Sequence, residues 1–121
     1  MKSILIIDDD EQIRTALRML LEQSGYEVIS APDGKKGLKL YHDKPTDLII
    51  TDLIMPEKEG IETIMELRRE FPDVKIIAIS GGGSNDPEVL LHVAKTLGAE
   101  RTIAKPFNNE DLLKAIRDLL K

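Results

Sequence analysis

Acidic, hydroxyl and ammonium side chains stand at the ends of several short apolar runs, where they suit metal and phosphoryl chemistry. Asp8 and Asp9 follow one run, Asp52 ends another, and Ser80 and Lys105 stand at the ends of two more. If the runs are neighbouring parallel strands, their carboxyl ends meet at one sheet edge, where open α/β sheets bind ligands. Clustered carboxylates repel unless a cation neutralises them, and hard oxygen ligands suit Mg²⁺, which favours a phosphate partner.

Some of these residues also have a purely structural interpretation. Asp10 completes the run of acids after Asp9 and suits the N-cap of a following helix, but this leaves Asp8 and Asp9 unexplained. Asp52 alone could shape a turn or cap a helix, since Pro56, a few residues later, cannot extend a central strand. The functional interpretation therefore depends on several strand ends taken together.

The elements that would position these residues alternate between strand and helix. The pattern predicts strands over 3–8, 26–31, 47–51, 74–80 and 101–104, and helices over 11–24, 34–43, 58–70, from Asp86–Pro87 to just before Gly98, and after a cap at Asn108 or Asn109. Such alternation indicates an α/β fold with a doubly wound parallel sheet. Right-handed crossovers would place helices on both faces. The pattern alone leaves the order of the strands open.

Two glycines and one apolar stripe bear on the predicted helices. Gly25 suits the left-handed conformation that ends the helix over 11–24. Gly37 lies inside the helix over 34–43 and weakens the prediction of a helix there. In the helix over 58–70, the apolar residues are Ile61, Ile64, Met65 and Leu67, and Met65 is interpreted as a packing or loop residue and not as a metal ligand.

Length and composition limit the class of protein. The 121 residues suffice for one domain, expected over 1–121. The absence of Cys excludes disulfides and thiolate metal sites and fits a reducing, cytoplasmic compartment. A net charge of −5, with no basic run longer than two residues, argues against direct nucleic-acid binding. No apolar run approaches a membrane span, and His42 and His92 lack partners at metal-ligand spacing, so we expect both at the surface.

The chain resembles the receiver domain of response regulators in two-component signalling, in particular the chemotaxis-regulator type. The resemblance covers nearly all of 1–121 and is carried, in order, by Asp8–Asp9, Asp52 followed by Met55–Pro56, Ser80, and Lys105–Pro106–Phe107. It implies a flavodoxin-like five-stranded parallel sheet with strand order 2-1-3-4-5, in which the first and third strands are neighbours. It also implies that a histidine kinase or a histidine phosphotransfer protein donates a phosphoryl group to Asp52.

The resemblance further implies how a Mg²⁺ cofactor is held. Asp9 is implied as a direct ligand, Asp8 as a ligand acting partly through water, and Asp52 as both a ligand and the nucleophile. The backbone carbonyl of Ile54 is implied to complete the protein ligands. Mg²⁺ in such a site neutralises charge on phosphoryl oxygens, which suits the anionic transition state of phosphoryl transfer.

A switch is implied as well, because phosphorylation would change a partner-binding surface. Lys105 is implied to contact a phosphoryl oxygen, and Ser80 to donate a hydrogen bond to the group. Leu90 and Leu91 are adjacent in the predicted fourth helix, which leaves one of them for a partner or for a homodimer mate. Thr102 departs from the family, which often has Tyr or Phe three residues before Lys105. The sequence does not identify the output partner.

Two other classes of protein stay open. Asp8–Asp9–Asp10 contains the Asp-x-Asp pattern of haloacid-dehalogenase-type phosphatases, but Gln12 stands where their Thr belongs and the chain is short for such an enzyme. A pseudo-receiver or a flavodoxin-like binding module would share the fold without accepting phosphate. With five strand-end residues present, the preferred hypothesis is a phosphoacceptor that assists its own phosphorylation and dephosphorylation, and not an enzyme acting on a separate substrate.

Overall fold

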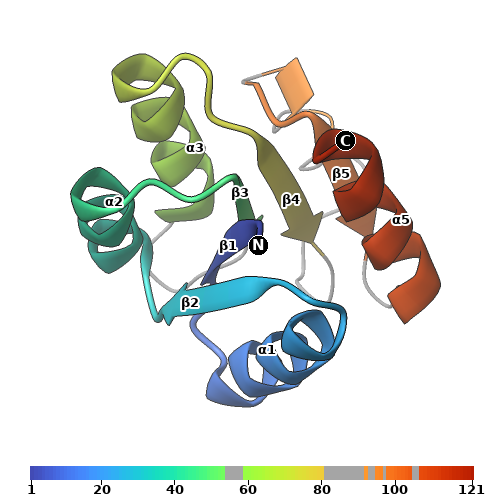
Figure 1. Ribbon diagram of the computed structural model, residues 1–121. Coiled ribbons are helices and arrows are strands. Elements are labelled where there is room, and N and C mark those ends of the chain that lie inside the picture. The colour runs from blue at the N-terminus through green and yellow to red at the C-terminus, as the bar shows by residue number, and fades with distance from the viewer. Residues whose placement is uncertain (54–58, 81–91, 93–94, 97, 105–106) are drawn as a thin grey trace.

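Figure 1 shows the computed structural model of the chain, in which a parallel sheet carries helices on both faces. The structure describes residues 1–53, 59–80, 92, 95–96, 98–104 and 107–121. The strands are hydrogen-bonded in the order β2-β1-β3-β4-β5, and all four pairings are parallel. This is the order that the resemblance implies, so the predicted fold class is confirmed.

The helices and strands of the described part begin and end within two residues of the predicted ranges. Their bounds are β1 (Ser3–Ile7), α1 (Glu11–Gln23), β2 (Glu27–Ala31), α2 (Gly34–Asp43), β3 (Leu48–Asp52), α3 (Glu59–Glu70), β4 (Ile76–Ser80), β5 (Arg101–Ala104) and α5 (Asn109–Leu119). The predicted fourth helix lies mainly outside the described residues.

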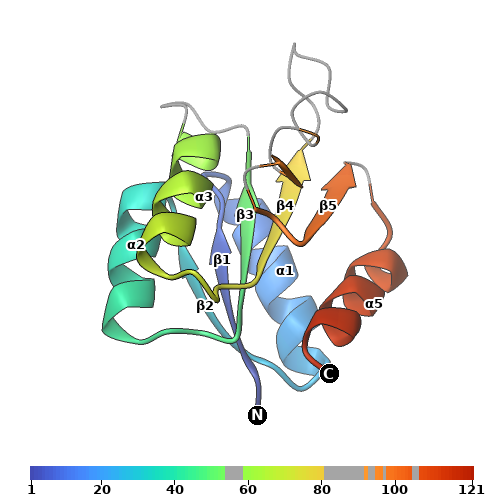
Figure 2. The ribbon, with the colours of Figure 1, turned by 90° about the horizontal axis from the view of Figure 1, so that it is seen from above.

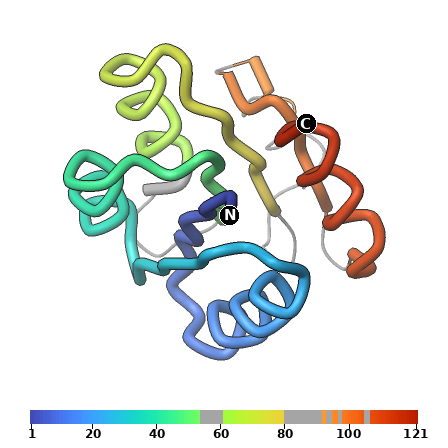
Figure 3. The backbone as a smooth tube through the Cα atoms, in the orientation of Figure 1, coloured from blue at the N-terminus to red at the C-terminus, as the bar shows by residue number. Residues whose placement is uncertain are grey.

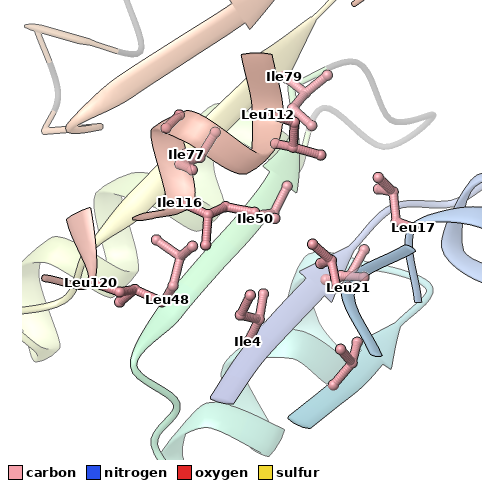
Figure 4. Packing of buried hydrophobic residues seen from close by; sticks show 13 residues of the cluster. Ile4, Leu17, Leu21, Leu48, Ile50, Ile77, Ile79, Leu112, Ile116 and Leu120 are labelled. Atoms are coloured by element: carbon pink, nitrogen blue, oxygen red, sulfur yellow. The ribbon is translucent and has the colours of Figure 1, made fainter. Parts of the chain in front are cut away.

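The sheet separates two hydrophobic layers. Figure 2 shows α2 and α3 on one face and α1 and α5 on the other. Because side chains alternate along a strand, β1 sends Leu5 and Ile7 into the first layer and Ile4 and Ile6 into the second. The second layer is drawn in Figure 4, where Ile4, Leu17, Leu21, Leu48, Ile50, Ile77, Ile79, Leu112, Ile116 and Leu120 are labelled.

The two central strands are buried on both faces. Residues Ile4–Ile7 and Leu48–Asp52 are all buried, which explains why the segments Ile4–Ile7 and Leu48–Ile50 are continuous apolar runs. The tube in Figure 3 follows the chain from the N-terminus through β1 and shows it between its neighbours in the middle of the fold. The register pairs Ile7 with Thr51, so β1 and β3 end side by side.

Local signals define the ends of several helices. Asp10, Asp33 and Asn108 are the N-caps of α1, α2 and α5, and the side chain of each accepts a backbone N–H of the first turn. Gly25 follows α1 with a φ of 95°, the left-handed conformation that its position predicts.

Polar contacts join distant segments at the edge opposite the strand carboxyl ends. The Ser3 N–H donates to Asp47 Oδ2 at 2.8 Å, and this bond lowers the pKa of the Asp47 carboxyl. Arg68 of α3 donates to the carbonyl oxygens of Pro72 and Gly98 and to Glu100 Oε1 at 2.7 Å. Sequence patterns do not reveal these contacts, because the Arg68 partners Gly98 and Glu100 lie 30 and 32 residues away.

One apolar residue of α3 lies at the surface of the protein. Ile64 and Leu67 are fully buried, whereas the Met65 side chain is exposed. Met65 follows Ile64 directly, and successive residues of a helix point in different directions, so its side chain lies outside the face of α3 that packs on the sheet. His42 and His92 are exposed, as predicted. In the described part of the chain, no helix combines the length and apolar character that a membrane span requires.

A close approach between α2 and β1 explains the glycine inside α2. A Cβ atom built on Gly37 would lie 2.4 Å from Ile7 Cδ1 and 2.7 Å from Ile7 Cγ1. Ile7 is 1% exposed, so its side chain has no free space to move into. The absence of a side chain at this position lets the helix approach the central strand.

We therefore predict that Gly37→Ala destabilises the fold. Ala is the better helix former by about 1 kcal/mol, but overpacking against Ile7 costs about 1–3 kcal/mol, so the net effect is a loss. Ile7→Val removes the atom in closest contact, and Gly37→Ala should cost less in that background. Chemical denaturation of the two single variants and the double variant measures the coupling; equal costs in both backgrounds would show that Ile7 is not the cause.

Candidate functional site

Three carboxylates from two adjacent strands meet at the carboxyl edge of the sheet. Asp8 and Asp9 follow β1 directly, and Asp52 is the last residue of β3. One oxygen atom from each carboxylate lies within 4.8 Å of the other two. Asp8 and Asp52 are buried, at 4% and 6% exposed, whereas Asp9 is exposed. The structure thus brings together the three acids that the sequence places at strand ends.

The pairing of β1 with β3 causes this proximity. Ile7 is level with Thr51 in the parallel register, so the next residue of each chain, Asp8 and Asp52, emerges at the same height. Asp52 is also paired with Ile79 of β4, and the Leu53 N–H donates to the Ile79 carbonyl oxygen at 2.9 Å. The end of β3 is therefore held at Thr51 by β1 and at Asp52 by β4.

The turn that carries Asp8 and Asp9 is held by hydrogen bonds to its backbone and to one side chain. The Asp8 N–H donates to the Ala31 carbonyl oxygen of β2 at 3.2 Å. The Asp10 N–H donates to Asp8 Oδ1 at 2.9 Å, which closes a tight turn of the Asx type. Asp10 then caps α1, which is its predicted structural role.

The donor set of the cluster fits a hard divalent cation. Mg²⁺ prefers oxygen ligands, keeps several waters and is usually held by one or two carboxylates. Asp8, Asp9 and Asp52 supply such oxygens close together, and the exposure of Asp9 leaves solvent access for waters and a further ligand. The individual role of each acid stays a prediction.

The remaining predicted site residues lie along the same edge or outside the described part. Ser80 is the last residue of β4 and pairs with Ala104, the last residue of β5. The ends of β3, β4 and β5 therefore follow one another across the sheet. Lys105 and Ile54 lie outside the described residues. Thr102 is half-buried in β5, where it pairs with Ala78.

Sequence reasoning missed one side chain that touches this turn. Arg14 Nη1 donates to the backbone carbonyl oxygen of Asp8 at 2.6 Å. Arg14 is in the first turns of α1 and is half-buried. The residue type gives no signal, because Arg18 one turn later is also an arginine but pairs with Glu22 at 3.6 Å, away from the turn. The position of Arg14, six residues after Asp8, is the only indication in the sequence.

Comparison with known families gives a match over most of the chain. The family model described as the response regulator receiver domain matches residues 4–117. The transcriptional regulatory protein CpxR of Escherichia coli is 38% identical over 121 residues, which is 100% of this chain and 50% of CpxR. The chain thus spans about half the length of the curated relatives that it matches.

Solved structures give the same result. A response regulator receiver domain protein from Clostridium thermocellum superposes with a TM-score of 0.91 at 30% identity, covering 99% of this chain and 94% of that one. The response regulator TrrA from Thermotoga maritima, solved in complex with Mg²⁺ and BeF, has a TM-score of 0.84 at 32% identity, covering 99% and 100%.

We predict that neutralising one acid of the cluster stabilises the protein when divalent cations are absent. Two like charges at such a separation repel by about 1 kcal/mol even with water-like screening. Asp9→Asn should therefore raise the free energy of unfolding in EDTA by up to about 1 kcal/mol. It should also reduce the stabilisation that Mg²⁺ gives.

Asp73→Asn is the matched control for this measurement. Asp73 is exposed in the turn before β4, at the opposite edge of the sheet, so its neutralisation should leave both quantities nearly unchanged. Denaturant titrations with EDTA and with Mg²⁺ measure the two effects. If Asp9→Asn behaves like Asp73→Asn, the acids do not interact strongly enough to form a cation site.

Proposed function

Because this chain belongs to the response regulator receiver domain family, we propose that it accepts a phosphoryl group on Asp52 in a Mg²⁺-dependent reaction. The donor is a histidine kinase or a histidine phosphotransfer protein. The observation that carries the proposal is the cluster of Asp8, Asp9 and Asp52, in which one oxygen from each carboxylate lies within 4.8 Å of the other two. Such a cluster suits phosphoryl transfer, which depends on position and on neutralised charge.

We assign the metal ligands from the chemistry of the donor set and the family pattern. Asp9 and Asp52 each supply a carboxylate oxygen, Asp8 acts partly through water, and the Ile54 carbonyl completes the set. When bound, Mg²⁺ neutralises negative charge on the phosphoryl oxygens and on the acids. The Mg²⁺–BeF complex of TrrA supports the choice of Mg²⁺ as the cation, since that response regulator was solved with Mg²⁺ bound.

Asp52 is the nucleophile of the proposed reaction. A carboxylate oxygen of Asp52 forms a bond to phosphorus while the P–N bond of the donor phosphohistidine breaks. The electron pair of that bond returns to the imidazole, which leaves as a neutral ring and keeps the proton on its other nitrogen. Asp52 suits this role because its backbone pairs with Ile79 of β4, the preceding residue Thr51 pairs with Ile7 of β1, and the residue is only 6% exposed. A fixed, largely desolvated nucleophile loses little freedom on reaching the reactive geometry.

Two further side chains complete the proposed response. Lys105 contacts a phosphoryl oxygen as a point charge, and Ser80 donates a hydrogen bond to the phosphoryl group. The strand register supports both assignments, because Ser80 pairs with Ala104, the residue before Lys105. Thr102 has no aromatic ring, so the response does not use a ring that changes rotamer at this position.

The proposed function also has a cellular compartment and a partner. We place the protein in the cytoplasm, a reducing compartment that a chain without Cys fits. The chain is the phosphoacceptor, assists its own phosphorylation and dephosphorylation, and has no separate substrate. Phosphorylation changes a surface that an output partner recognises, and that partner is not assigned. CpxR is a transcriptional regulatory protein, but this chain matches only half of its length.

We predict that acetyl phosphate and Mg²⁺ add one phosphoryl group to the protein and that Asp52→Asn abolishes the addition. The amide of Asn is a poor nucleophile, while its size and the strand position stay the same. Intact-mass spectrometry measures the addition, and EDTA should suppress it.

Asp33→Asn serves as the control for this substitution. Asp33 is the N-cap of α2 at the same edge of the sheet, and Asn caps a helix as well as Asp does, so labelling should be unchanged. Equal labelling of wild type and Asp52→Asn would overturn the assignment of Asp52. Steady turnover of a phosphomonoester would favour the phosphatase class, and a bound flavin chromophore would favour the flavodoxin-like class.

A further inference from the structure

The Asp8 carbonyl oxygen accepts a hydrogen bond that the proposed chemistry does not by itself require. Arg14 of α1 reaches back over the turn and donates to this oxygen from Nη1 at 2.6 Å. Among the described residues, no carboxylate lies within 4.0 Å of the Arg14 guanidinium nitrogens, although Asp10 and Glu11 are close in sequence. The guanidinium of Arg14 thus makes a charge-assisted hydrogen bond to a backbone carbonyl and not an ion pair with a nearby acid, so its main effect is to fix the Asp8–Asp9 peptide group.

The peptide in question joins two acids of the cluster. Because a peptide group is planar, fixing the Asp8 carbonyl also fixes the direction of the Asp9 N–H and the path of the chain into Asp9. The neighbouring bonds, Asp8 N–H to Ala31 and Asp10 N–H to Asp8 Oδ1, hold the groups on either side of this peptide. Arg14 supplies the contact to the peptide itself, and it does so from a different element.

Asp9 depends on this restraint more than the other two acids do. Asp8 and Asp52 are buried, and packing limits their side chains, whereas Asp9 is exposed. Within the described part of the chain, no hydrogen bond to the Asp9 side chain is present to orient it. The location of the Asp9 carboxylate is therefore set mainly by the backbone turn that carries it.

We infer that Arg14 is a positioning residue for the divalent-cation site, because its hydrogen bond to the Asp8 carbonyl keeps the Asp9 carboxylate within reach of Asp52. The inference rests on the proposed function and assigns a role to a residue outside the acidic cluster. Groups that orient metal ligands without touching the metal typically contribute tenfold or more to metal affinity.

The opposite effect would follow if Arg14 acted only through its charge. A cation beside three acids lowers their attraction for Mg²⁺, so its removal would strengthen Mg²⁺ binding. Loss of a positioning contact weakens binding. The sign of the change in affinity therefore separates a positioning role from a purely electrostatic one.

The test is a Mg²⁺ titration of the wild type, Arg14→Met and Arg18→Met. Backbone amide chemical shifts monitor the binding in each protein. Met has a helix propensity close to that of Arg and replaces the apolar stem, so α1 should stay folded. Arg18 is one turn further along α1 and is half exposed, with no contact to the Asp8–Asp10 turn, so Arg18→Met removes the same charge without the contact. Arg14→Gln is a second neutral variant if Arg14→Met does not fold.

We expect Arg14→Met to weaken Mg²⁺ binding about tenfold and Arg18→Met to leave it within about twofold, with native-like spectra for both. Arg14→Lys, which keeps a donor and the charge, should recover part of the affinity. Unchanged or tighter binding in Arg14→Met would overturn the inference while leaving the proposed function intact. If the wild type does not bind Mg²⁺ at all, both the inference and the proposed function are wrong.

Discussion

The parallel pairing of β1 with β3 is the constraint on which the site depends. Each strand is buried on both faces, so neither can slip by one residue without moving an apolar set into the wrong layer. The register that satisfies both layers places Ile7 beside Thr51, and this brings Asp8 and Asp52 to the same height. The hydrophobic core thus holds carboxylates together against their mutual repulsion, which a bound cation would relieve.

The three acids of the cluster differ in how firmly the surrounding structure holds them. Asp52 is fixed inside the sheet, Asp8 is held by the turn that it closes, and Asp9 is exposed at the surface. In the proposed reaction, exposed Asp9 is accessible to a metal from solvent, while buried Asp52 is held by its strand. This division agrees with a reaction in which position matters more than covalent assistance from the protein. Contacts such as that of Arg14 supply order where packing does not.

Much of the fold is predictable because its signals are local. Apolar runs identified the strands, Asp10 and the pair Asn108–Asn109 marked helix starts, and Gly25 marked a helix end. The strand order could not be predicted from local signals, since hydrophobic periodicity does not say which strands are neighbours. The resemblance to receiver domains supplied the order. Gly37 weakened the prediction of a helix that is present, because its reason is a contact with Ile7 on another element.

The candidate site shows the same division between local and distant information. Strand ends in the sequence identified Asp8, Asp9 and Asp52, and the structure brings these residues together. Arg14 was missed because its hydrogen-bond acceptor is a backbone carbonyl oxygen. Every residue has such an oxygen, so the residue types in the sequence do not indicate the contact. The Arg68 network at the other edge was missed because its partners are distant in sequence and meet only after the sheet forms.

The proposed function requires that these carboxylates hold a divalent cation at the carboxyl edge of the sheet. The most direct measurement is the anomalous difference map of crystals soaked in Mn²⁺, which, like Mg²⁺, favours octahedral oxygen ligands. We expect a principal peak in contact with the carboxylates of Asp9 and Asp52, at a distance of about 2 Å from each bound oxygen. A map with no peak at the cluster, or with a metal bound there without Asp52, would contradict it.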